Sequence, residues 1–170
     1  MIPFGFLPCC DYGTDALRLN ERLVDLAYAV TRTVPLADSA TAQAARQRYP
    51  GQADERPFTT RCDTISGDDF FAGSFLSAEA QRVMDVRTGG QGRYCTTEQE
   101  DSAVAAALNR FGLLDRYVSL RTASNFDQPA PGETTEQRLQ SFPGTAPAVE
   151  NEYRVGSAFA HYLEAHPGQP

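Results

Sequence analysis

ISGDDFFAG, residues 65–73, begins with the last two residues of a predicted β-strand. That strand covers residues 58–66, which are rich in Phe, Thr, Cys and Ile. A polar turn closes this strand, and the aromatic residues Phe70 and Phe71 follow at once. Open α/β sheets bind ligands beyond the carboxyl ends of their strands. The stretch therefore predicts an α/β sheet with two aromatic rings close to a position where such sheets bind ligands.

Two later stretches have the same form, a predicted strand followed by polar residues. TEQED, residues 97–101, follows a short predicted strand around residues 92–96. LRTASNFD, residues 120–127, ends a strand that alternating side chains predict over residues 116–124. The chain thus has three predicted strands, and each ends in residues that are able to contact a ligand.

Helical patterns separate and flank these strands. Apolar spacing, capping residues and Pro or Gly stops predict five helices. The first has the apolar face Leu19, Leu23, Leu26 and Val30, with a cap at Thr14 or Asp15 and a stop at Pro35. The second runs from a cap at Asp38 through Arg48, and the third from a cap at Ser77 to Thr88. The fourth begins at Thr97 with the buried face Val104, Leu108 and Phe111, and the fifth has Val149, Tyr153, Gly156, Phe159 and Leu163 at helical spacing. Residues 127–147 predict a long loop with one helical turn.

The alternation of helices and strands predicts an α/β domain with a central, at least partly parallel sheet flanked by helices. Three strands leave a sheet edge uncovered, and an uncovered edge favours self-association. We therefore expect residues 1–170 to form a single partial domain, with a homo-oligomer as one way of covering the edge.

Composition excludes several classes of function. The net charge of −7 makes nucleic acid an unfavourable partner. All fifteen basic residues are Arg, so no mechanism that depends on lysine is available. No apolar run reaches the roughly 20 residues that a membrane span needs, and no signal peptide is visible. The sequence does not indicate a compartment.

Cysteines and histidines show no metal-site spacing. The four Cys, at positions 9, 10, 62 and 95, are interpreted as reduced or buried thiols, with a disulfide involving Cys9 or Cys10 as the alternative. His161 and His166 are expected at the surface. The sequence therefore predicts no metal ion and no cofactor.

In their order and separation, the three stretches resemble the purine nucleoside permease family, within the nucleoside phosphorylase-like superfamily. The resemblance runs from Pro3 to Pro170 and includes AVENEYRVGS, residues 148–157. It implies the C-terminal half of a three-layer nucleoside phosphorylase-like fold with a partial mixed sheet. The N-terminal half, which carries the phosphate loop, would be absent, since no Gly-rich loop with Arg precedes residue 60.

The resemblance also implies two walls of a nucleoside site. The ring of Phe70 would stack on a purine, and the backbone of Phe71 would approach the base edge. Glu100 would accept hydrogen bonds from the ribose hydroxyls, because one carboxylate can accept from two vicinal donors. A competing interpretation makes Thr97 and Glu100 a helix capping box. The superfamily has Met where this chain has Gln99.

The third wall would come from the stretch around Asn125. The wider superfamily often has an Asp here that protonates the purine; an amide cannot act as a general acid, but it can donate and accept hydrogen bonds with a 6-oxopurine. Asp127 is a substitute candidate acid, and Ser124 a candidate substrate contact. Arg121 is the nearest candidate cation for phosphate, and pairing with a neighbouring acid is its alternative role.

The implied function is purine nucleoside binding that resembles a purine nucleoside permease, with a phosphorylase-like site for cleavage of the N-glycosidic bond. Two alternatives remain open. One is a nucleoside-binding protein that does not cleave its ligand. The other is an inactive fragment that needs a missing half or self-association.

Overall fold

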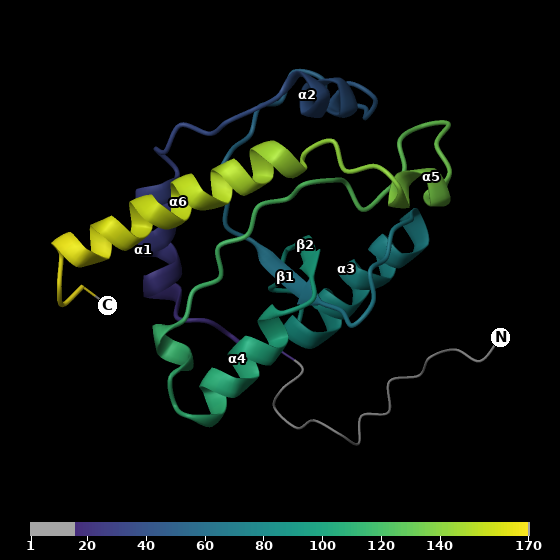
Figure 1. The fold of residues 1–170 in the computed structure, drawn as a ribbon. Coiled ribbons are helices and arrows are strands. Elements are labelled where there is room, and N and C mark those ends of the chain that lie inside the picture. The colour runs from purple at the N-terminus through teal and green to yellow at the C-terminus, as the bar shows by residue number, and fades with distance from the viewer. Residues whose placement is uncertain (1–15, 170) are drawn as a thin grey trace.

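The computed structural model describes residues 16–169, which form helices around a two-stranded sheet (Figure 1). In chain order the elements are α1 (Glu21–Thr31), α2 (Ala40–Arg46), β1 (Asp63–Ser66), α3 (Ser74–Thr88), β2 (Tyr94–Glu98), α4 (Asp101–Arg110), the 3-10 helix η1 (Leu114–Arg116), α5 (Thr135–Leu139) and α6 (Thr145–Ala165). This mixture confirms the α/β class. Within the described residues, no helix is both long and apolar enough to cross a membrane.

The sheet consists of β1 and β2, which run parallel and pair from Asp63 opposite Tyr94 to Ser66 opposite Glu98. Helix α3 connects the two strands and contacts β2, while α4 contacts β1. The predicted strands at 58–66 and 92–96 are confirmed in position, although β1 is shorter and β2 extends two residues further.

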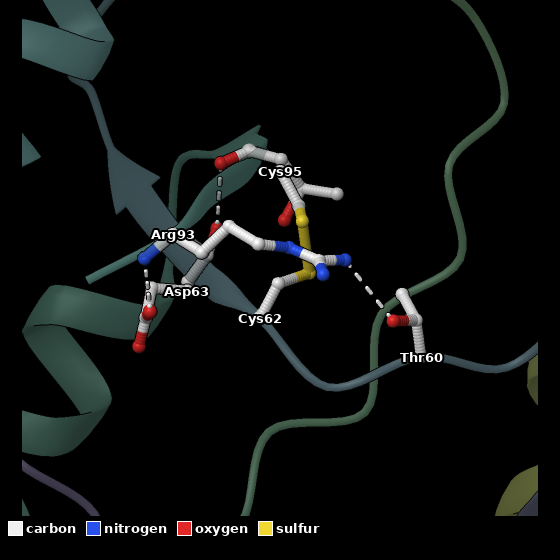
Figure 2. Close-up of a disulfide and its surroundings, with 7 residues drawn as sticks. Thr60, Cys62, Asp63, Arg93 and Cys95 are labelled. Atoms are coloured by element: carbon white, nitrogen blue, oxygen red, sulfur yellow. Dashed lines mark hydrogen bonds between the residues drawn. A yellow bond between two sulfur atoms is a disulfide. The ribbon is translucent and has the colours of Figure 1, made fainter. Parts of the chain in front are cut away.

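A disulfide between Cys62 and Cys95 joins the two strands close to their starts (Figure 2). Their Cα atoms are 5.9 Å apart, because the parallel pairing of neighbouring residues already brings the two backbones together. The prediction of reduced thiols is therefore wrong for this pair. Cys9 and Cys10 lie outside the described residues.

Local capping sets where the helices begin. The side chain of Asn20 accepts from the N–H groups of the first turn of α1, and Ser39 caps α2. The predicted cap at Asp38 is thus off by one residue, and the predicted caps at Thr14 and Asp15 lie outside the described residues. Helix α3 starts three residues before Ser77, the predicted cap, which is buried inside the helix.

The main core lies between α1 and α6, where Leu23, Ala27 and Phe159 are buried. Half-buried apolar residues pack around these three: Leu26, Val30, Val118, Leu120 and Leu163. The helical spacing of Leu and Phe therefore identified the packed faces of α1 and of the second half of α6 correctly. Both histidines are exposed, as expected.

Other predicted core positions are wrong. Phe111 is 75% exposed, Tyr153 is 74% exposed, and Val104 and Val149 are also exposed. The apolar spacing correctly indicates that these residues share helix faces, but no element among residues 16–169 covers those faces. The predicted strand at 116–124 is also wrong as a member of the sheet, because between η1 and α5 the chain has no regular secondary structure.

Reduction of the Cys62–Cys95 disulfide should destabilise the fold. The bridge closes a loop across a sequence separation of 33, and a cross-link of that length contributes about 3–4 kcal/mol by restricting the unfolded chain. We expect dithiothreitol to lower the melting temperature of the wild-type protein by roughly 10 °C. The Cys62→Ser/Cys95→Ser double variant should already melt at the lower temperature and should not respond to dithiothreitol. An equal melting temperature of the wild type with and without reductant would contradict the bridge.

Candidate functional site

The structure brings the three polar stretches together at the carboxyl ends of β1 and β2. The N–H of Gly67 donates to the carbonyl oxygen of Glu98 at 2.9 Å, so the first stretch contacts the second. The N–H of Gly73 donates to the carbonyl oxygen of Asp127 at 2.7 Å, so the first stretch also contacts the third. Backbone hydrogen bonds therefore hold the three stretches next to one another.

Arg121 is surrounded by three carboxylates. Its guanidinium contacts Asp101 at 2.6 Å, Glu100 at 3.2 Å and Glu98 at 3.3 Å. We call these four residues the Arg121 cluster. The alternative role predicted for Arg121, pairing with an acid at the strand end, is therefore confirmed. Because three acids already neutralise this cation, it is poorly suited to bind a free phosphate.

Glu98 and Ser66 cap the first turn of α4. Glu98 Oε2 accepts from the N–H groups of Glu100 and Asp101, both at 2.6 Å. The Ser66 hydroxyl accepts from the N–H of Ser102 at 2.8 Å and donates to Glu98. The predicted capping box of Thr97 and Glu100 is wrong, because β2 continues through Thr97 and the helix begins later. The Glu100 side chain stays 65% exposed beside Arg121.

Asp101 is the buried centre of the cluster. Besides Arg121, it accepts hydrogen bonds from the hydroxyls of Ser119 and Tyr117, the latter at 2.7 Å. Burial acts to raise the pKa of Asp101, but hydrogen bonds from Arg121, Ser119 and Tyr117 outweigh it and hold that pKa below its usual range. Burial and the bond to Asp101 together raise the pKa of Tyr117 to about 12.

Asn125 has a fixed side chain with hydrogen-bonding capacity to spare. Its Oδ1 accepts from the Ser124 hydroxyl at 2.8 Å, and its Nδ2 donates to the carbonyl of Phe126 at 3.2 Å. A primary amide has two N–H donors and can accept twice at its oxygen. One donor and one acceptor position of Asn125 are therefore not used by these two bonds.

Asp127 ties the third stretch to the sheet. Its Oδ2 accepts from the hydroxyl of Tyr94, on β2, at 2.8 Å. Burial of Tyr94 is the main cause that raises the pKa of its phenol, and this hydrogen bond is the second. The phenol therefore stays protonated and keeps donating to Asp127 at neutral pH.

Arg138, on α5, is a residue that the sequence reasoning did not identify. It is buried, and its guanidinium donates to the carbonyls of Phe126, at 2.7 Å, and Ser141. Its Nη2 has no hydrogen-bond partner among residues 16–169. The ring of Tyr49 stacks on that of Phe126, with the ring centroids 3.9 Å apart. These contacts fix the backbone beside Asn125. The sequence does contain one indication, because the capping box of Thr134 and Gln137 predicts a helical turn that includes Arg138.

The predicted aromatic wall is partly open. Phe70 is 54% exposed, and its ring lies 5.8 Å from that of Phe142 with a tilt of 44°. Phe71 is half-buried. Phe70 therefore has free ring surface beside a second aromatic side chain that the sequence reasoning had not included.

Ser124 lines a cavity of about 460 Å³ between the third stretch and α6. The other lining residues are Thr122, Thr145, Ala148, Val149, Glu152 and Tyr153. The predicted residues Phe70, Phe71, Glu100, Arg121, Asn125 and Asp127 are not part of that lining. The three stretches are thus adjacent, but this cavity is not the predicted nucleoside site, because Ser124 is the one predicted site residue in its lining.

The family model for purine nucleoside permeases (NUP) matches residues 6–166. The chain belongs to the purine nucleoside permease family. A probable purine nucleoside permease of Schizosaccharomyces pombe is 32% identical over 163 residues, which cover 91% of this chain and 47% of that relative. A purine nucleoside permease of Candida albicans is 28% identical over 159 residues, which cover 88% of this chain and 39% of the relative.

The chain thus spans less than half the length of each of these two purine nucleoside permeases. No solved structure matches it. The match confirms the family that the three stretches indicated. It covers all of the residues that form the site described above.

Replacement of Asp101 by Asn should weaken the Arg121 cluster and make the stability of the protein depend less on pH. Because the folded-state pKa of Asp101 lies below its unfolded value, its stabilisation is present above about pH 4 and is lost as the pH falls below that value. We expect Asp101→Asn to lower the free energy of unfolding by about 2 kcal/mol at neutral pH and to flatten its fall in acid. Urea titrations from neutral to acidic pH would measure both, with the exposed Asp54→Asn as control. An unchanged acid dependence would contradict the assignment.

Gly144 allows the backbone of the third stretch to lie against the start of α6. A Cβ atom there would stand 2.3 Å from the Ser124 carbonyl oxygen, which accepts from the Gly144 N–H. We expect Gly144→Ala to destabilise the protein by about 1–3 kcal/mol. Gly156→Ala, where a Cβ would meet open space inside α6, should instead stabilise by up to about 1 kcal/mol. Thermal unfolding of both variants tests this contrast, and equal effects would refute the close approach.

Proposed function

We propose that this chain recognises a purine nucleoside at the joined ends of its strands, as part of the nucleoside uptake that its relatives' names imply. The observation that carries the proposal is the pair of backbone hydrogen bonds that place the three family stretches side by side, from Gly67 to Glu98 and from Gly73 to Asp127. Phe70, Glu100 and Asn125 then each supply one kind of contact.

Phe70 is the proposed stacking partner of the base. Its ring is 54% exposed, so a planar ligand can cover it without displacing packed side chains. Stacking of a base on an aromatic ring contributes about 1–3 kcal/mol. The half-buried Phe71, next in sequence, would present its backbone to the base edge.

Asn125 is the proposed contact to the base edge. The bonds to Ser124 and Phe126 orient the amide and leave a donor and an acceptor position for a ligand. A 6-oxopurine edge offers an acceptor and a donor in return, which supports inosine and guanosine as ligands. The Ser124 hydroxyl assists by holding the amide oxygen.

Glu100 is the proposed ribose contact. Its carboxylate is exposed and shares Arg121 with two buried acids, so it can turn toward a sugar while Arg121 remains neutralised by Asp101 and Glu98. Vicinal ribose hydroxyls would then replace the Arg121 contact at 3.2 Å. Before ligand binds, Arg121 holds the acid in place and is therefore a positioning residue.

The same geometry supports binding without cleavage. Departure of a purine requires a proton donor, and the amide of Asn125 is not a general acid. Asp127, the other candidate, has one carboxylate oxygen engaged by Tyr94. Phosphate would need a cation, and Arg121 is already paired with acids. We therefore propose that residues 1–170 are a nucleoside-binding part of a nucleoside phosphorylase-like domain.

Titration calorimetry of the purified chain with inosine and adenosine, with and without phosphate, tests this proposal. We expect saturable binding and no free base in the mixture afterwards. Phe70→Ala should weaken inosine binding roughly 10- to 100-fold. Phe111→Ala, which removes a more exposed ring at the end of α4, should not change it. Equal affinities of the wild type and Phe70→Ala would rule out stacking, and release of base would rule out binding without cleavage.

A further inference from the structure

Residues 117–124 have the side-chain alternation of a β-strand with both faces in contact with other elements. Tyr117, Ser119 and Arg121 all bind Asp101 at the start of α4. The intervening Val118 and Leu120 pack against the core of α1 and α6. A period of two is the period of an extended strand. We call these residues the orphan strand.

Within the described part of the chain, the edges of the orphan strand lack the backbone hydrogen bonds that a strand in a sheet makes. No backbone N–H or C=O group of residues 118–123 has a hydrogen-bond partner among residues 16–169. Residues 117–120 are half-buried, and a backbone group withdrawn from water without a partner costs about 1–3 kcal/mol. Unpaired strand edges of this kind are templates for another strand.

An apolar groove runs beside the orphan strand. Thr122 and Ser124 form one side of the cavity of about 460 Å³, and α6 forms the other. On α6, Val149 is 66% exposed and Tyr153 is 74% exposed, although both line this cavity. The Thr122 hydroxyl donates to Glu152 at 2.9 Å and holds the strand against the helix. A strand with apolar side chains would bury these two residues.

We infer that the orphan strand pairs with a β-strand from the part of the family's length that this chain does not match. That part is more than half of both relatives, whose matched shares are 47% and 39%. The sheet of β1 and β2 is smaller than the three or more strands that are usually stable independently. A second copy of this chain fits less well, because it would bring another net charge of −7 to the contact.

Co-expression with the unmatched portion of the S. pombe relative, as a separate tagged polypeptide, tests the inference. We expect an equimolar complex in which the amides of residues 118–123 exchange hydrogen at least about 10-fold more slowly than in the chain alone. Failure to form a complex, or a complex in which these amides exchange as before, would overturn the inference. The inference would also be overturned if these amides exchanged slowly in the chain alone and the chain had the mass of a dimer. The orphan strand would then pair with a second copy of the chain.

Ala123 offers a variant that changes the strand edge with little other effect, because its side chain is exposed. Ala123→Pro removes one N–H donor and should weaken the complex roughly 10-fold with an unchanged melting temperature of the chain alone. Ala123→Val keeps the donor and should bind as the wild type does. Equal binding by both variants would contradict strand pairing. No nucleoside is used, so failure here leaves the proposed nucleoside site untouched.

Discussion

The hydrogen-bonded pair of Arg121 and Asp101 is the contact on which the arrangement of this molecule depends. It joins the orphan strand to the start of α4, and through Glu98 it reaches the end of β2. Asp101 and Glu98 have almost fully covered side chains, so each would be costly without a partner. The N-terminus of α4 adds its own positive end and N–H donors to this negative cluster. Removal of Arg121 would leave the two covered carboxylates, Asp101 and Glu98, without this counter-ion.

A polar cluster can have this importance because the apolar core is small. The buried cluster between α1 and α6 consists of Leu23, Ala27 and Phe159, and many of the other buried apolar residues are alanines. An alanine contributes little transfer free energy compared with leucine or phenylalanine. The two strands are held by the Cys62–Cys95 bridge and by capping contacts such as Ser66 to Glu98 rather than by a thick layer of side chains. Hydrogen bonds and charge pairs therefore determine the geometry of the strand ends.

Much of the local structure followed from sequence, whereas contacts between distant segments did not. The Leu spacing of α1 and the position of Phe159 identified packed faces, because helical periodicity depends only on neighbouring residues. The same periodicity failed for Phe111 and Tyr153, since it shows which residues share a face but not whether anything covers it. The caps at Glu98 and Ser39 were missed because a cap depends on where the preceding segment ends.

The candidate site shows the same division at the level of chemistry. Family resemblance identified the three stretches, and the structure holds them together through backbone hydrogen bonds donated by Gly67 and Gly73. Arg138 and Gly144 were missed, although both fix the stretch that carries Asn125, because their roles depend on the approach of α5 and α6. The side chains proposed to contact the ligand, Phe70 and Glu100, are exposed. In the proposed site, the positions of the contact groups are set within this chain, and enclosure of a ligand would need surface from elsewhere. The backbone of residues 118–123, which has no hydrogen-bond partner among residues 16–169, has the same need.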